Sequence, residues 1–317
     1  MAMWDVVKYS SEYKEQWDKC VAHSKNATFL FYRDYMDYHS HRFDDFSLIF
    51  RHKGKIEAVL PGNRVADTLY SHQGLTYGGL VMSPRIKGRR VLGLFKALNR
   101  YLADNGIKRV VYKKVPWIYS VIPSEEDLYA LWKICGARIE GRNLSSAIRI
   151  KNKSRWEESR MSGLRKAAAH GLAVEQSTDF DGFWRILTDN LNTRHHVTPV
   201  HSVDEILTLA NRFPDNIKLY IARCGAEPVG GVVVYINYPV VHTQYISATP
   251  EGKKCGAIDA VIYHLLTREF TDYEYLDFGQ STERHGEVLN ESLLFQKEGF
   301  GGRGVCYDIY SYPVSVI

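Results

Sequence analysis

The sequence predicts an α/β (α+β) protein made of two tandem copies of one unit, at residues 1–150 and 151–317. Its 317 residues are 45% hydrophobic and 24% charged, which is ordinary for a globular chain of about two domains. Strand-like apolar runs alternate with segments that have the 3/4 apolar spacing of amphipathic helices. Because this alternation occurs twice in the same order, the sequence indicates an internal repeat.

The first copy begins with an apolar, glycine-interrupted run at residues 75–82, followed by a basic turn at residues 84–90. Residues 91–102 place their apolar side chains on one helical face, and Asn105 with Gly106 predicts the end of that helix. We expect a strand at residues 107–112 and then a short helix that starts near Ser124 and stops at Gly136.

The second copy repeats this order from the β-rich run Val240–Ala248. Residues 258–270 predict an amphipathic helix, residues 273–278 a strand, residues 289–297 a short helix and residues 305–312 a terminal strand. Aligning the glycines of the two copies pairs Asp277 with Lys114. The second copy therefore has a carboxylate where the first is basic.

Charge is distributed unequally between the halves. Residues 1–155 carry 27 basic and 15 acidic side chains, whereas residues 156–317 carry 14 and 21. Residues 85–114 alone contain ten Lys or Arg and one acid, Asp104. This pattern fits either a solvated face or a surface that meets an anionic partner.

Several classes of protein are disfavoured. The uncharged stretch at residues 228–250 is long enough for a membrane span, but glycines, Asn237 and Pro239 divide it into two strands. No signal peptide is visible, and the five scattered cysteines form no CxxC pair, so we expect a cytoplasmic protein without disulfides or a zinc site. The apparent GxGxxG at residues 299–304 follows a helix and precedes a strand, which excludes a dinucleotide fold there.

The turn after the run Val240–Ala248 has chemical content. Free backbone N–H groups at a helix start favour a pyrophosphate, and two ammonium groups lie in the same turn. The candidate cofactor residues are Gly252, Lys253, Lys254, Cys255, Gly256 and Ala257. A β–α turn with glycine is also common for purely structural reasons.

Lys253 stands three residues before Gly256, in the order strand, turn, helix, strand, and this resembles the acyl-CoA-binding core of the GNAT acyltransferase superfamily. The segment LRKAAAHGLAV at residues 164–174 resembles the opening of the second domain of FemAB-like, tandem-GNAT transferases. YGGL at residues 77–80 and KEGFG at residues 297–301 are also similar to that family. The resemblance covers nearly the whole chain and implies two GNAT-like domains, each a mixed, mostly antiparallel central sheet flanked by helices.

The resemblance also implies roles for the two copies. The second would bind acyl-CoA and be catalytic, with backbone oxyanion donors around Tyr245, Ile246 and Ser247 of its central strand. The first would be the acceptor platform. The candidate acceptor contacts are Tyr77, Arg89, Arg90, His195, His196 and Lys297. We prefer an acceptor contact over a metal site for the histidines because no Cys or carboxylate lies at ligand spacing.

Acyl transfer to an amine needs a base near the thioester and a proton source for the thiolate. Asp277, Glu283 and His285 are the ranked candidates for the base because they lie at the end of the next strand and in its following loop. Tyr307 is the candidate general acid.

Three functions follow as hypotheses. The first is an acyl-CoA-dependent N-acyltransferase, with acetyl-CoA or another acyl-CoA as cosubstrate and an anionic amine acceptor such as an amino sugar of a cell-surface glycan precursor. The second is a Fem-like ligase that uses aminoacyl-tRNA, which is disfavoured because no heptad pattern follows Val174. The third is a basic nucleic-acid-binding module, for which no DNA- or RNA-binding signature is present.

Overall fold

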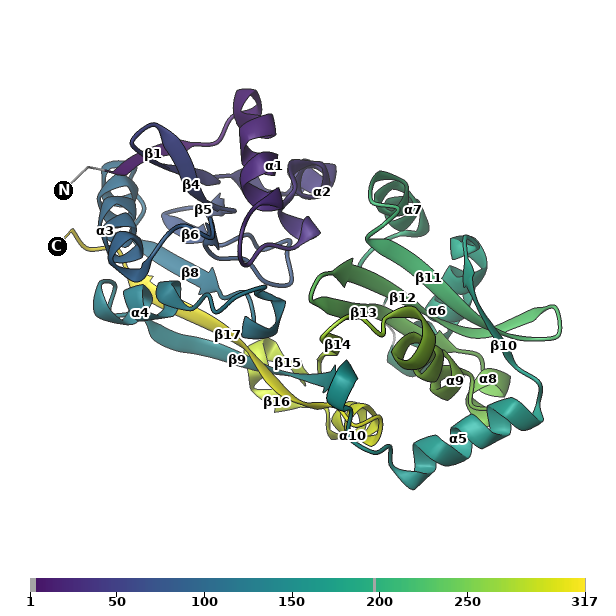
Figure 1. Cartoon of the computed structure of the whole chain (residues 1–317). Helices are drawn as coiled ribbons and strands as arrows, with labels where there is room; N and C mark the ends of the chain where they lie inside the picture. Colours follow the sequence, from purple (N-terminus) through teal and green to yellow (C-terminus); the bar gives the residue numbers. More distant parts are fainter. Residues whose placement is uncertain (1–3, 196–197, 317) are drawn as a thin grey trace. The chain divides into compact units, whose positions relative to one another are not determined.

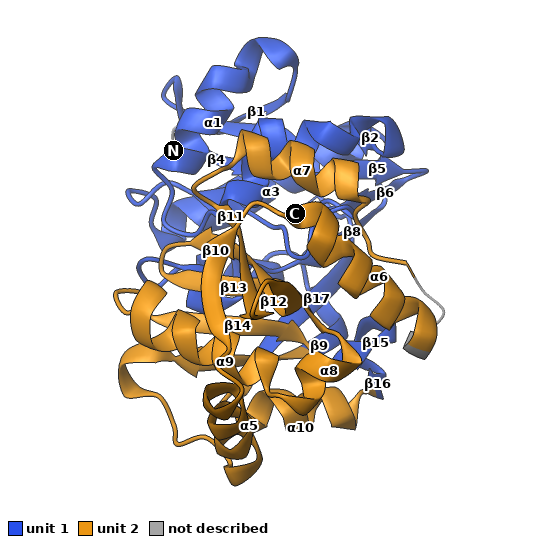
Figure 2. Cartoon of the chain, turned by 90° about the vertical axis from the view of Figure 1, so that its right-hand side faces the viewer, with its two compact units in different colours: residues 1–143, 282–288, 306–317 blue, residues 144–281, 289–305 orange. Residues whose placement is uncertain are grey.

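A computed structural model describes residues 4–195 and 198–316 of the chain. The chain forms two compact units (Figure 2). Unit 1 comprises residues 1–143, 282–288 and 306–317, and unit 2 comprises residues 144–281 and 289–305. The expected ranges 1–150 and 151–317 differ from this division, because strands β9 (Arg138–Arg149) and β17 (Arg303–Pro313) each contribute residues to both units.

Unit 2 is built on a mixed sheet in which all pairs are antiparallel except one (Figure 1). The strand order is β10-β11-β12-β13-β14 followed by β9. The single parallel pair joins β13 to β14. The strands are β10 (Ala173–Ser177), β11 (Ile217–Cys224), β12 (Glu227–Asn237), β13 (Val240–Ala248) and β14 (Tyr275–Gln280).

Helices pack on both faces of this sheet. α9 (Ala257–His264) buries Val261 and Ile262 in one core cluster with Val241 and Leu276. On the other face, Trp184 of α6 packs edge-on against Tyr245 of β13, with ring centroids 5.0 Å apart. The remaining helices are α5 (Glu158–Ala169), α7 (Val203–Arg212), α8 (Pro250–Lys254) and α10 (Glu291–Gly299), and α6 spans Phe180–His195.

Unit 1 contains an antiparallel sheet of order β1-β3-β4-β7 and a second group of strands in which β17, β8, β6, β5 and β2 follow one another. Its one described parallel pair joins β6 to β8. The strands are β1 (Trp4–Lys8), β2 (Asp44–Asp45), β3 (Leu48–His52), β4 (Lys55–Leu60), β5 (Asn63–Val65), β6 (Thr68–Tyr70), β7 (Val81–Met82) and β8 (Arg109–Lys113).

The helices of unit 1 include α3 (Gly88–Asp104), which buries Val91, Leu94 and Leu98 of its apolar stripe in the core of the unit. α4 (Glu126–Lys133) packs beside it, and α1 (Lys14–Ala22) and α2 (Arg33–Met36) complete the set. The helices and strands expected in each repeat are confirmed, because α3, β8 and α4 recur as α9, β14 and α10. The mixed, mostly antiparallel fold class is confirmed as well.

Candidate active site

The parallel strands β13 and β14 of unit 2 separate soon after they meet. They pair at Val240 with Tyr275, at Val241 with Leu276 and at His242 with Asp277. Beyond this last pair β13 continues for six residues alongside β12, while β14 continues toward β9. The two strands therefore form a fork whose closed end is the pair of His242 and Asp277.

Two backbone amides of β13 face the open side of this fork. Thr249 N donates to Val229 O of the neighbouring strand (3.0 Å), and residue pairs in an antiparallel ladder alternate between bonded and non-bonded. Ser247 is therefore bonded to β12, whereas the N–H groups of Ile246 and Ala248 point away from β12. They are free to bond a ligand in the fork.

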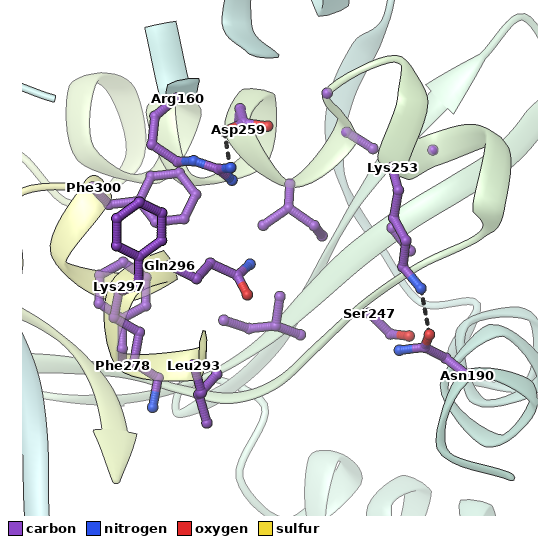
Figure 3. Close-up of a pocket in the computed structure, with 17 residues that line it drawn as sticks. Arg160, Asn190, Ser247, Lys253, Asp259, Phe278, Leu293, Gln296, Lys297 and Phe300 are labelled. Atoms are coloured by element: carbon purple, nitrogen blue, oxygen red, sulfur yellow. Dashed lines mark hydrogen bonds and ion pairs between the residues drawn. The ribbon is translucent and has the colours of Figure 1, made fainter. Parts of the chain in front are cut away.

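A cavity of about 390 Å³ occupies the fork (Figure 3). Ile246 and Ala248 line it from β13, Phe278 lines it from β14, and the starts of α8 and α9 close one end. Figure 3 shows Lys253 and Asn190 on one side and Arg160 with Phe300 on the other. The Nζ of Lys253 donates to Asn190 Oδ1, and Arg160 Nη1 lies 3.2 Å from Asp259 Oδ1. The lining is thus largely apolar with two cations at its rim.

A buried polar cluster lies at the closed end of the fork. Asp277 is completely buried, and its Oδ1 accepts hydrogen bonds from Ser145 Oγ (2.5 Å) and Gly279 N (3.2 Å). Its Oδ2 lies 2.9 Å from Nδ1 of His242, whose side chain is 13% exposed. A carboxylate held in this way fixes the imidazole with its Nδ1–H toward Asp277, which leaves Nε2 as a proton acceptor.

The glycine at position 279 makes room for this imidazole. Gly279 has φ +74°, and a Cβ there would lie 2.9 Å from Cε1 of His242. Lys297 of α10 packs beside the same segment and donates to Gly279 O (2.9 Å) and Gln280 O (2.7 Å). Burial lowers the pKa of Lys297 to about 8, although the charge of Asp277 opposes this shift.

Residues 149–286 match the family described as "Acetyltransferase (GNAT) domain". This range contains the fork, the cavity turn and the cluster of His242 and Asp277. The match identifies a GNAT acetyltransferase domain.

The whole chain is similar in structure to FemX, with a TM-score of 0.68 and 11% identity over 98% of this chain and 97% of that chain. It is similar to L-PGS from Bacillus licheniformis, with a TM-score of 0.61 and 10% identity over 96% and 92% of the two chains. It is also similar to a conserved protein of unknown function from Bacteroides thetaiotaomicron, with a TM-score of 0.64 and 10% identity over 99% of this chain and 100% of that chain. At these identities the likeness establishes the fold, which is FemAB-like and tandem-GNAT. No curated protein matches the sequence of the chain.

Two glycines of the turn are required by close packing. A Cβ at Gly252 would lie 1.9 Å from Val229 O, and one at Gly256, which has φ +78°, would lie 2.1 Å from Gly163 O. Close packing of α8 on β12 and of α9 on α5 thus accounts for both glycines. Ala257 and Gly256 still line the cavity at the start of α9, where backbone N–H groups are available.

The other turn residues separate into two groups. Lys253 lines the cavity, whereas Lys254 is exposed and lies 3.6 Å from Glu251 on the same helix. Cys255 is buried and its Sγ donates to Gly252 O (3.5 Å). Of the three expected oxyanion residues, Ile246 presents its amide to the fork, whereas the ladder directs the N–H groups of Tyr245 and Ser247 to β12, although Ser247 also lines the cavity. The Tyr245 hydroxyl lies 2.6 Å from Nδ1 of His201, and Ser247 Oγ donates to Ile186 O (3.3 Å).

Of the four predicted catalytic residues, Asp277 lies at the fork of unit 2, and the other three belong to unit 1. Glu283 and His285 are exposed residues of unit 1, in the hairpin formed by β15 (Thr282–Glu283) and β16 (Val288–Leu289). Tyr307 is buried in unit 1, where its hydroxyl lies 3.2 Å from that of Tyr119. Tyr77 joins this aromatic cluster, with its ring 4.7 Å from that of Tyr119.

The predicted acceptor contacts are similarly divided. Arg89 and Arg90 are exposed at the start of α3, and Arg90 Nη1 donates to Glu57 (2.8 Å). Lys297 is 5% exposed and lines the cavity of the GNAT domain. His195 ends α6, its side chain lies outside the described residues, and so does His196 entirely. No group of three or more His, Cys, Asp or Glu within residues 4–195 and 198–316 has the geometry to hold a metal ion.

No role for His242 follows from the sequence alone. It lies in a run of apolar and β-branched residues, and only the register of β13 on β14 places it opposite Asp277. Nor is any described helix long and apolar enough to cross a bilayer.

The corresponding fork of unit 1 is closed. β6 and β8 also pair three times, ending at Tyr70 with Val111, and Ser83-Pro84 follows β7 as Thr249-Pro250 follows β13. Tyr112, the counterpart of Phe278, accepts the N–H of Leu80 at its hydroxyl (2.6 Å) and donates to Asp127 Oδ2 (2.7 Å). This register pairs Asp277 with Val111 rather than with Lys114.

The second amide of the unit 1 fork is also satisfied. Met82 N donates to Asn26 Oδ1 (2.9 Å), and Asn26 Nδ2 donates back to Leu80 O (2.8 Å). Leu80 and Met82 correspond to Ile246 and Ala248. Side chains of unit 1 thus take the positions that a ligand would take in unit 2.

Proposed function

We propose that the chain is an acyl-CoA-dependent N-acyltransferase whose donor binds in the fork between β13 and β14. The observation that carries this proposal is the cavity between the separated strands, with two inward-facing amides on its wall, together with the imidazole–carboxylate pair where the two strands last meet. Acetyl-CoA is the proposed donor, and the proposed acceptor is an anionic amine such as an amino sugar of a cell-surface glycan precursor.

The donor fits the residues along the cavity. The cations of Lys253 and Arg160 and the amides at the start of α9 suit a diphosphate. The apolar wall formed by Ile246, Ala248 and Phe278 suits the pantetheine chain. The N–H of Ile246 can donate to the thioester oxygen and stabilise the oxyanion that develops there.

His242 is the proposed general base. Its Nε2 would accept a proton from the amine as the amine nitrogen bonds to the thioester carbon, and the buried carboxylate of Asp277 would stabilise the imidazolium. The carbon–sulfur bond then breaks, and the proton held on His242 is available to the departing thiolate. Asp277 is completely buried, so it acts on His242 and does not touch the substrate.

The two sheet faces supply separate approaches to the fork. Val241 and Leu276 belong to the core under α9, and side chains alternate along a strand, so His242 and Asp277 lie on the opposite face. A donor on the α9 side and an amine from the face of His242 would meet at the closed end. This arrangement supports a direct transfer between the two substrates.

Fem-like transfer from aminoacyl-tRNA is the second candidate, because the folds of FemX and L-PGS are similar to this one. The family resemblance associates tRNA use with a long helical-hairpin arm in the second domain. The longest described helix of unit 2, α6, has 16 residues. This favours the CoA donor. A third possibility, a non-enzymatic nucleic-acid module, leaves the His242 and Asp277 pair without a role.

A donor assay separates these possibilities. We would measure thiol release from acetyl-CoA in the presence of amino sugars, nucleotide-linked amino sugars and simple amines, with wild type and His242→Gln. Amine-dependent thiol release that falls in the variant supports the proposal. Transfer of a labelled aminoacyl group from tRNA, with no binding of CoA, would instead establish the second candidate. Neither activity, together with RNA binding, would establish the third.

A further inference from the structure

The outward face of α3 in unit 1 is a stripe of cations. Arg89, Lys96 and Arg100 are all exposed, and their spacing places them within about 40° of one another around the helix axis. The buried residues of α3, including Leu94 and Leu98, lie on the opposite side. None of the three cations makes a described ion pair with a carboxylate, so their charge is directed outward.

The outward face of the neighbouring helix α4 is aromatic. Trp132 is 65% exposed and Tyr129 is 54% exposed, and their rings lie 5.8 Å apart. Nζ of Lys133 lies 5.9 Å from the ring of Trp132. Of the six tryptophans, all of them described, the other exposed one is Trp117, in the segment that leads into α4. Large exposed aromatic side chains at this density indicate a surface that another body covers.

The two faces belong to one surface. α3 and α4 pack together in the core of unit 1, and a Cβ at Gly88 of α3 would lie 3.9 Å from Cγ of Glu126 at the start of α4 (Figure 1). The acidic residues on these helices are partly neutralised, since Glu126 pairs with Lys25 (2.5 Å) and Asp127 is buried. The α3–α4 face, defined by Arg89, Lys96, Arg100, Tyr129, Trp132 and Lys133, is therefore cationic and aromatic.

We propose that the α3–α4 face docks on an anionic lipid membrane. Trp and Tyr favour the boundary between headgroups and acyl chains, and Lys and Arg are attracted by anionic headgroups. Val121 and Ile122, 49% and 46% exposed in the segment before α4, add aliphatic surface that lipid accepts and that nucleic-acid bases do not require. A single-stranded nucleic acid needs a groove with stacking platforms. Unit 1 has a cavity lined by α1, β4 and the turn at residues 83–85, but neither α4 nor the cation stripe lines it.

The test is sedimentation of the full chain with vesicles of phosphatidylcholine alone or with one quarter phosphatidylglycerol. We expect binding to the anionic vesicles that weakens as salt increases. Lys96→Gln/Arg100→Gln/Lys133→Gln should lower the partition coefficient on the order of 100-fold, because each cation near an anionic surface contributes roughly fivefold. Trp132→Ser should lower it by about tenfold. Arg89 is left unchanged because it is also a predicted acceptor contact.

Matched controls remove three exposed cations or one exposed aromatic ring from unit 2. Lys166→Gln/Arg185→Gln/Arg268→Gln has the same net charge as the first variant, and Tyr238, which is 58% exposed, can be changed to Ser. Both should keep wild-type vesicle binding. Equal losses in the control and the α3–α4 variants would show an effect of net charge and overturn the proposal. Absence of vesicle binding, or RNA binding that depends on the same three cations while vesicles are ignored, would also overturn it.

Discussion

The two copies of the GNAT-like unit contain the same strand fork, and they treat it in opposite ways. In unit 1 the hydroxyl of Tyr112 accepts a hydrogen bond from the N–H of Leu80, and the side-chain oxygen of Asn26 accepts one from the N–H of Met82. In unit 2 Phe278 replaces the tyrosine and a cavity of about 390 Å³ remains. A buried N–H without a partner costs about 1–3 kcal/mol, so a closed fork must satisfy its own amides, whereas an open one leaves them to a ligand.

The closed ends of the forks differ as well. Tyr70 and Val111 form the last pair in unit 1, while His242 and Asp277 form it in unit 2. A proton-transfer pair and a cavity between the strands therefore occur together at the fork of unit 2, whereas the described fork of unit 1 is filled by its own side chains. The two copies thus share the backbone arrangement of the fork, and they differ in the few side chains that fill it or leave it open.

The largest expected effect is on catalysis. His242→Gln should lower kcat by about 10²–10⁴-fold, the usual contribution of general-base catalysis, while donor affinity survives. Steady-state kinetics of acyl transfer check this. Tyr70→Phe, at the matching position of unit 1, is the control and should keep wild-type kcat. Equal activity of His242→Gln and wild type would remove the base from this fork.

The next effect concerns two lysines: Lys297, beside the fork of unit 2, and Lys113, which ends β8 and whose Nζ donates to Leu75 O. Burial lowers the pKa of Lys297 to about 8 from 10.5, and that of Lys113 to about 8 by the same cause. Between pH 8 and 10.5 the unfolded chain binds more protons at Lys297 than the folded chain, so stability rises with pH there. Denaturant unfolding gives the free energy of unfolding of wild type and of Lys297→Met at each pH. The difference between these two free energies should change by about 3 kcal/mol across this window. A difference that is constant with pH would contradict this reading of Lys297.

Replacing Phe278 of unit 2 by tyrosine, the residue at the matching position of unit 1, should close the fork of unit 2. Phe278→Tyr places a hydroxyl where Tyr112 has one, within reach of the N–H of Ile246, so acetyl-CoA affinity should fall by about tenfold, the equivalent of one hydrogen bond and some lost space. Titration calorimetry measures this. The ring of Phe278 stacks on that of Phe300, with centroids 5.6 Å apart. Phe300→Tyr adds a hydroxyl to this second ring, so it is the matched control and should have a smaller effect. Unchanged affinity in Phe278→Tyr would mean that the donor does not use the fork.

The smallest expected effect separates the two lysines of the turn. Lys253→Glu should weaken acetyl-CoA binding by roughly fivefold to tenfold, because its ammonium is at the cavity rim. Lys254→Glu should bind as wild type, since Lys254 is exposed and does not line the cavity. The same calorimetric titration compares them. If the two variants lose equal affinity for acetyl-CoA, the loss comes from the change in net charge. The position of Lys253 at the cavity would then not matter for binding.

The sequence predicted the repeat and the fold class, because helix periodicity and apolar runs are local signals. It could not predict strand register, which pairs residues far apart in the chain. Glycine matching therefore aligned Asp277 with Lys114, whereas the strand pairs align it with Val111. His242 lies in an apolar run, and only the strand register pairs it with Asp277, so the sequence did not indicate it as a candidate.

Gly252 and Gly256 illustrate a second limit. Their positions in the sequence suit a phosphate turn, yet Val229 and Gly163 already require a residue without a Cβ there. The sequence could not distinguish packing from ligand binding, because both impose the same residue.

Hydrogen exchange at four backbone amides tests the difference between the forks most directly. Without ligand, the N–H groups of Leu80 and Met82 should exchange slowly, because Tyr112 and Asn26 bond them, while those of Ile246 and Ala248 should exchange faster. Addition of acetyl-CoA should slow exchange at Ile246 and Ala248 and leave Leu80 and Met82 unchanged. Ligand-induced protection at Leu80 and Met82, or none at Ile246 and Ala248, would contradict the assignment of the donor to unit 2.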